Sequence, residues 1–157
     1  MKTKILCLLV LGMAPTVTTA QLGPTVVTIA PPTGLAAKPG ETAKATLTVT
    51  VASGYHANSD KPNDEFLIPF SLKWNSGPAE VVSVTYPKTQ TLKLGFSAKP
   101  VSVFTGTFDI VTQFKVPSDA PPGPAVVKGK LRYQACDDRS CLPPKTVEVS
   151  LPTTIGK

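Results

Sequence analysis

Apolar and polar residues alternate along residues 43–51. Alternate positions carry Ala, Leu or Val, and the positions between them carry Lys or Thr. Because successive side chains of a β-strand point to opposite faces of a sheet, this period of two predicts a half-buried strand. Residues 107–116 alternate in a similar way, with Phe108, Ile110 and Phe114 among their apolar positions, and predict a second such strand.

Shorter apolar runs bounded by proline and glycine predict further strands. The chain contains 17 prolines, which would interrupt most long helices, and no segment after residue 20 shows a convincing helical period. Residues 54–65 are polar and rich in turn-forming types, so we expect a loop there. The expected strands are residues 26–29, 43–51, 66–74, 79–86, 92–104, 107–116, 126–135 and 146–151. About eight short strands with regular turn signals predict an all-β domain, an immunoglobulin-like β-sandwich, with a small barrel as the alternative.

Residues 1–20 have the pattern of a secretory signal peptide. Lys2 and Lys4 precede an apolar run over residues 5–13, which is short for a membrane span, and small residues at 18–20 offer a cleavage site. An uncleaved membrane anchor is the alternative. We therefore expect an exported, periplasmic protein whose single domain covers residues 21–157, with no membrane-spanning segment after the leader.

The charge of the chain argues against a nucleic-acid partner. Removal of residues 1–20 would take away two lysines and lower the formal net charge from +6 to +4. The remaining basic residues are scattered and aromatic residues are few, so we expect no nucleic-acid surface. The mild basicity suits solubility, acidic partners or a membrane surface.

Two cysteines carry the candidate chemistry. Cys7 would leave with the leader, whereas Cys136 and Cys141 flank four polar residues in a predicted turn between two strands. An exported compartment permits a disulfide, and residues that flank a short turn come within bonding range. A closed loop this short constrains the unfolded chain by only about 2 kcal/mol, against about 4.7 kcal/mol for one of a hundred residues. These observations leave a structural bond and a reversible redox pair both open.

The charges beside the cysteines do not decide which sulfur is more reactive. Arg139 would favour a thiolate, whereas Asp137 and Asp138 would oppose it. We expect all three side chains to be solvated, so neither effect is large.

The sequence around the cysteines resembles a known family. The run YQAC at residues 133–136, followed by CLPP at residues 141–144, is similar to the cysteine hairpin of the N-terminal periplasmic domain of the thiol:disulfide interchange protein DsbD. The resemblance extends through Gly54-Tyr55 and over residues 25–151. It favours the redox interpretation of the pair, as an analogy added to its chemistry.

The resemblance implies an immunoglobulin-like domain that passes reducing equivalents to periplasmic partners. Cys136 and Cys141 would then be the catalytic pair of a thiol-disulfide oxidoreductase that needs no cofactor, with Cys141 facing the partner and Cys136 resolving the mixed disulfide. The sequence has no counterpart of the family's membrane-embedded and thioredoxin-like regions, so we expect a separate membrane or thioredoxin-like reductant. The alternative is a non-catalytic, exported, protein-binding sandwich with a structural disulfide.

The same family covers its cysteines with a loop that bears an aromatic residue. The best positional match is residues 94–98, with Phe96 as the shield, although Leu94 and Gly95 replace the acidic residues usual there. Residues 64–66 lie too early in the strand order to be this loop. Tyr133 is a second aromatic residue that would either line the site or pack in the sandwich core.

The single histidine, His56, gives no sign of a metal site. No second histidine and no carboxylate cluster at ligand spacing accompanies it, so we expect no metal and place His56 at a turn or on the surface. Trp74 is expected to be a core residue rather than a ligand platform.

Overall fold

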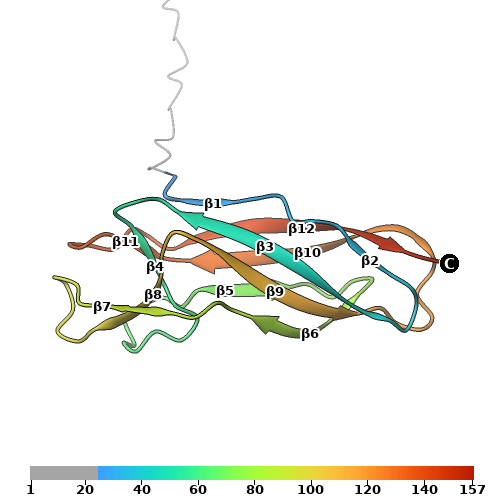
Figure 1. Ribbon diagram of the computed structural model, residues 1–157, viewed down its shortest axis with the longest axis horizontal. Coiled ribbons are helices and arrows are strands. Elements are labelled where there is room, and N and C mark those ends of the chain that lie inside the picture. Colours follow the sequence, from blue (N-terminus) through green and yellow to red (C-terminus); the bar gives the residue numbers. More distant parts are fainter. Residues whose placement is uncertain (1–24) are drawn as a thin grey trace, which may run out of the picture.

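The computed structural model describes residues 25–157, which form an all-β sandwich (Figure 1). Twelve strands are arranged in three four-stranded sheets, and these residues contain no helix. None of this part of the chain could therefore cross a membrane as an apolar helix. The signal peptide expected at residues 1–20 lies outside the described residues.

Two of the sheets form the body of the sandwich. The first contains, in spatial order, β1 (Val27–Ile29), β3 (Thr42–Val51), β9 (Thr107–Lys115) and β6 (Glu80–Thr85). The second contains β2 (Leu35–Ala37), β12 (Lys145–Ile155), β10 (Gly123–Tyr133) and β5 (Ser71–Trp74). Neighbouring strands in both sheets are antiparallel except β2, which runs parallel to β12.

The core lies between these two sheets. Buried and more exposed positions alternate over much of β3, β9, β10 and β12, because their sequences place apolar residues at every second position. Leu47 and Ile110 from the first sheet share one cluster with Leu131 and Val149 from the second. Burial of these side chains stabilises the fold by about 25 cal/mol for each Å² of apolar surface.

A third sheet extends the sandwich at one end. It contains, in spatial order, β11 (Ala135–Cys136), β4 (His56–Asn58), β8 (Val101–Phe104) and β7 (Gln90–Leu92). β11 follows β10 after a single residue, Gln134, so the longest hairpin of the body carries the cysteines to this end. In Figure 1 the third sheet and the C-terminus lie at opposite ends of the long axis.

The structure confirms the all-β sandwich but contains more strands than the eight expected. The additional strands are β2, β4, β7 and β11, each of only two or three residues. Strands this short contain too few residues to show a period in the sequence. The loop expected at residues 54–65 is wrong in part, because it includes β4, which pairs with both β11 and β8.

Candidate functional site

Cys136 and Cys141 form a disulfide in the connection between β10 and β12. Cys136 ends β11 and pairs across the sheet with His56, and its Cα atom lies 3.9 Å from that of Cys141. Cys136 is fully buried, whereas Cys141 is half-buried. An approaching thiol therefore reaches this disulfide from the side of Cys141.

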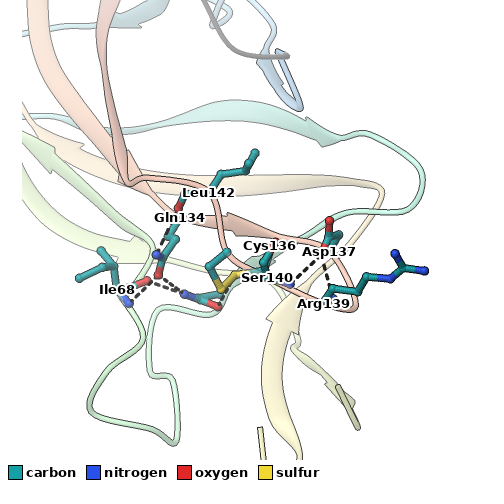
Figure 2. The surroundings of a disulfide bond; sticks show 9 residues. Ile68, Gln134, Cys136, Asp137, Arg139, Ser140 and Leu142 are labelled. Atoms are coloured by element: carbon teal, nitrogen blue, oxygen red, sulfur yellow. Dashed lines mark hydrogen bonds between the residues drawn. A yellow bond between two sulfur atoms is a disulfide. The ribbon is translucent and has the colours of Figure 1, made fainter. Parts of the chain in front are cut away.

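Hydrogen bonds from Asp137 hold the turn between the cysteines. Its carboxylate oxygen accepts from the backbone N–H groups of Arg139 at 2.8 Å and Ser140 at 2.7 Å (Figure 2). The backbone N–H of Asp137 also donates to the Ser140 carbonyl at 2.9 Å. The two backbone donors lower the pKa of the Asp137 carboxyl. Asp137 thus shapes the turn as well as contributing charge.

Two side-chain amides support the strand that carries Cys136. Oε1 of Gln134 accepts from the Ile68 backbone N–H at 3.2 Å and from Asn58 Nδ2 at 3.1 Å. Nε2 of Gln134 donates to the Leu142 carbonyl at 3.2 Å, and Figure 2 shows Gln134 between Ile68 and Leu142. Asn58 Nδ2 also donates to the Ile68 carbonyl at 3.1 Å. The amides therefore tie both arms of the cysteine hairpin to the segment before β5.

His56 is buried beside the disulfide, so its expected position at a turn or on the surface is wrong. It is 3% exposed, because β4 lies between β11 and β8 in the third sheet. Its Nε2 atom has no hydrogen-bond partner among the described residues. Burial lowers the pKa of His56, and the carboxylates of Asp138 and Asp137 oppose that shift. The site thus places an imidazole that favours its neutral form across the sheet from Cys136.

Residues 94–96 lie against the cysteine hairpin. The Gly95 N–H donates to the Asp138 carbonyl at 3.2 Å, and a Cβ atom at Gly95 would lie 3.1 Å from the same oxygen. Glycine therefore permits the close approach of the two backbones. Phe96 stacks on His56 with ring centroids 6.3 Å apart and packs in the same apolar cluster as Cys141. The structure thus places Phe96 on His56, and Phe96 and Cys141 against one apolar cluster.

The other aromatic candidates lie elsewhere. Tyr133 is 4% exposed and stacks on Phe70 in the sandwich core, with ring centroids 6.3 Å apart, which favours the packing role that the sequence left open. Trp74 packs edge-on against Phe114. Phe66 is 84% exposed and stands apart from the buried aromatic side chains.

Sequence reasoning missed the supporting roles of Asn58 and Gln134. Asn58 fell in a segment interpreted as a loop, and Gln134 belonged to the cysteine run without an assigned role. The one signal in the sequence was that Gln134 follows Tyr133 directly and precedes Cys136 by two residues. No such signal marked Asn58. Among residues 25–157, no three His, Cys, Asp or Glu side chains gather as they would around a metal ion.

Comparison with protein families gives one match that covers most of the chain. The model described as thiol:disulfide interchange protein DsbD, N-terminal, matches residues 27–153. A search of curated protein sequences found no match to this chain.

Two solved structures share the fold. The N-terminal periplasmic domain of ScsB from Proteus mirabilis aligns with a TM-score of 0.61 at 13% identity, over 85% of this chain and 49% of that one. The reduced N-terminal domain of DsbD from Neisseria meningitidis aligns with a TM-score of 0.50 at 19% identity, over 80% of this chain and 86% of that one. This chain thus spans about half the length of the ScsB structure, and at such identities the likeness concerns the fold alone.

Proposed function

Since this chain belongs to the family of the N-terminal domain of the thiol:disulfide interchange protein DsbD, we propose that it exchanges reducing equivalents through Cys136 and Cys141. One observation carries the proposal: the disulfide joins a fully buried cysteine to a half-buried one at the end of a hairpin. Thiol–disulfide exchange requires a sulfur that an incoming thiolate can reach. Burial shields the second sulfur from external thiols and leaves it available to attack Cys141 within the domain.

The exchange proceeds in two displacement steps. In the reduced domain, the Cys141 thiolate attacks a partner disulfide, forms a mixed disulfide and releases one partner sulfur as a thiolate. Cys136 then loses its proton and attacks the Cys141 sulfur, which closes the domain's own disulfide and releases the second partner sulfur. The two released thiolates take up two protons, so the partner gains two electrons and the domain loses two.

The difference in burial supports this division of labour. Cys141 is the half-buried residue and Cys136 is 0% exposed, so Cys141 meets the partner and Cys136 resolves the mixed disulfide. Leu142 remains paired to the hairpin through its N–H bond to the Ala135 carbonyl at 2.8 Å. That bond holds the two sulfur atoms near each other when the disulfide opens.

Phe96 acts in this proposal as a shield for the pair. It packs against the same apolar cluster as Cys141 and stacks on His56, and a single backbone hydrogen bond joins the preceding Gly95 to the hairpin. A loop joined to the hairpin by one backbone hydrogen bond can move away when a partner binds, and it limits access by small thiols otherwise. Phe96 is thus a gating residue, and the cysteines are the catalytic residues.

The partners of the domain are other exported thiol–disulfide proteins. A membrane-embedded or thioredoxin-like dithiol partner returns the domain to its reduced form, because each cycle consumes two electrons. The ScsB domain that shares this fold is periplasmic by its description, and we place this domain in the same kind of compartment, where disulfides persist.

A redox titration tests the proposal first. The domain is equilibrated with glutathione buffers, and its dithiol and disulfide forms are quantified by thiol alkylation. We expect a reduction potential within the range of exchanging pairs. A value well below about −300 mV is typical of inert structural disulfides and would contradict the redox function, leaving the binding-module alternative.

Single-cysteine variants test the division of labour. Incubated with an oxidised thioredoxin-type protein, Cys136→Ser should accumulate a mixed disulfide through Cys141, because no resolving thiol remains. Cys141→Ser should form little mixed disulfide, since its remaining thiol is buried. If only Cys141→Ser accumulated a mixed disulfide, the roles of the two cysteines would be reversed. The absence of mixed disulfides from both variants would count against exchange.

A further inference from the structure

A carbonyl oxygen faces the buried sulfur of the pair. Oδ1 of Asn58 lies 3.9 Å from Sγ of Cys136, and both residues are 0% exposed. A neighbour fixes the orientation of this amide. Its Nδ2 atom lies 3.1 Å from the Ile68 carbonyl oxygen, which can only accept a hydrogen bond. The oxygen of Asn58 must therefore be the atom that faces Cys136.

This contact changes its character with the redox state. While Cys136 is bonded to Cys141, its sulfur has no hydrogen to donate, and Asn58 Oδ1 has no other donor among residues 25–157. A buried acceptor without a donor is destabilising. Reduction places a hydrogen on the Cys136 sulfur, and an S–H group is a donor, although a weak one.

We propose, on the basis of the redox function above, that Asn58 accepts a hydrogen bond from the reduced Cys136 thiol and so stabilises the dithiol form. The bond also keeps Cys136 neutral while Cys141 attacks the partner, because a carbonyl oxygen favours S–H over a thiolate. When Cys136 then attacks the mixed disulfide, its proton passes to the released partner sulfur. Asn58 is thus a positioning residue that acts through Cys136.

The neighbouring polar residues do not offer the same contact. His56 pairs with Cys136 across the sheet, but its ring stacks on Phe96. Gln134 directs both ends of its amide to other groups, namely the Ile68 N–H, Asn58 Nδ2 and the Leu142 carbonyl. Asn58 is therefore the polar side chain within hydrogen-bonding range of the sulfur.

The glutathione equilibrium of Asn58→Leu tests this role. Loss of the acceptor should shift the equilibrium about fivefold toward the disulfide, a potential about 20 mV more negative. Asn58→Asp retains an oxygen toward the sulfur, so its equilibrium should shift toward the dithiol or stay unchanged. Ser59→Ala is the matched control, because Ser59 is also 0% exposed and its hydroxyl has no partner among the described residues. We expect the control to leave the potential unchanged.

The S–H stretching band supplies a readout that a purely structural role would not move. In reduced Cys141→Ser the band comes from Cys136 alone, provided the leader with Cys7 is removed. We expect it at lower frequency than the band of a solvated thiol, and at higher frequency once Asn58→Leu is added. A solvent-like band in Cys141→Ser would overturn the inference even if Asn58→Leu fails to fold. An unchanged potential in folded Asn58→Leu would overturn it as well.

These measurements separate this inference from the proposed function. Neither the potential difference nor the S–H band requires a partner protein. A shifted band in a domain that never exchanges would refute the redox function and retain the hydrogen bond. If the domain exchanges with partners but neither the S–H band nor the potential moves, the redox function stands and the hydrogen bond of Asn58 is refuted.

Discussion

The body of the sandwich and its cysteine end bury different kinds of side chain. The body joins β3 and β9 to β10 and β12 through a core made largely of aliphatic and aromatic residues. At the cysteine end, β4 and the residue after it bury His56, Asn58 and Ser59, three of the five buried polar residues in the described part of the chain. Polar groups are thus concentrated in the small sheet beside the disulfide.

The cysteine end therefore contains buried polar groups that stability alone would not favour. Burial of a polar group is unfavourable unless a hydrogen bond compensates it. His56 Nε2 and Ser59 Oγ have no such partner among residues 25–157, and Asn58 Oδ1 faces only a sulfur. The apolar core of the body therefore offsets the unfavourable burial of polar groups at the cysteine end.

Shortening a side chain in the core of the body should produce the largest loss of stability. Leu131 is fully buried in β10, so Leu131→Ala should lower the free energy of unfolding by about 3 kcal/mol through lost burial and a residual cavity. Urea unfolding measures the change. Val126→Ala in the same strand is the control, because Val126 is 50% exposed and should change stability by less than about 0.5 kcal/mol. Equal losses at both positions would contradict the division between body and surface.

Removal of the disulfide should cost less than that core truncation. The free energy of unfolding of the double variant Cys136→Ser, Cys141→Ser should be about 2 kcal/mol lower, because the bond closes only a short loop. Urea unfolding again measures the loss, and the wild-type domain reduced with dithiothreitol is the control for the covalent bond itself. A double variant that fails to fold would show that the cysteine end supports the body, which reverses the comparison.

The two regions also differ in how far the sequence predicts them. In β3 and β9 each residue's environment follows from its place in its own strand, so alternation alone identified both strands and their buried faces. β4 has three residues, all buried, and no alternation. Its burial depends on pairing with β11 and β8, which lie far away in the sequence.

Dependence on distant parts of the sequence also separates the predicted from the unpredicted parts of the site. The spacing of Cys136 and Cys141 at a turn is local, and their disulfide was predictable from it. The neighbours of the buried sulfur come from a distant strand, so the sequence indicated neither the burial of His56 nor the contact of Asn58 with Cys136. Phe96 and Cys141 pack against the same apolar cluster. The assignment of Phe96 as a shield came from the family resemblance and stays a prediction.

Acidification should weaken the cysteine end through His56. Burial lowers the pKa of this imidazole from its ordinary value of 6.5, so the unfolded chain binds a proton at a higher pH than the folded domain does. The contribution of neutral His56 to the free energy of unfolding is therefore complete above about pH 6.5 and is lost as the pH falls below that value. Urea unfolding between pH 7.5 and pH 4.5 should show this loss, and His56→Gln should reduce its slope.

The control for this pH series is Asp137→Asn. The Asp137 carboxyl also has a lowered pKa, from an ordinary value of 3.8, so its stabilising effect is lost only in more acidic solution. Asp137→Asn should therefore retain the loss of stability below about pH 6.5. Because the Asp137 carboxylate opposes the lowering of the His56 pKa, the variant should move that loss, if anything, to lower pH. A slope near pH 6 that persists in His56→Gln would show that another group titrates there.

Substitution of Phe96 should affect stability least and access to the sulfur most. Phe96 is half-buried and packs against the same apolar cluster as Cys141, so Phe96→Ala should cost no more than about 1 kcal/mol. Removal of the ring uncovers the pair, and the rate at which reduced glutathione attacks the domain's disulfide should rise several-fold. Stopped-flow or quenched assays of disulfide reduction measure that rate.

Phe66→Ala is the matched control, because it removes an aromatic ring that is 84% exposed and lies outside the apolar cluster of Cys141. It should change neither the rate nor the stability. Similar acceleration in both variants would indicate a general loosening of this end of the sandwich. An unchanged rate in Phe96→Ala would remove Phe96 from the role of shield, and access to Cys141 would then depend on the hairpin alone.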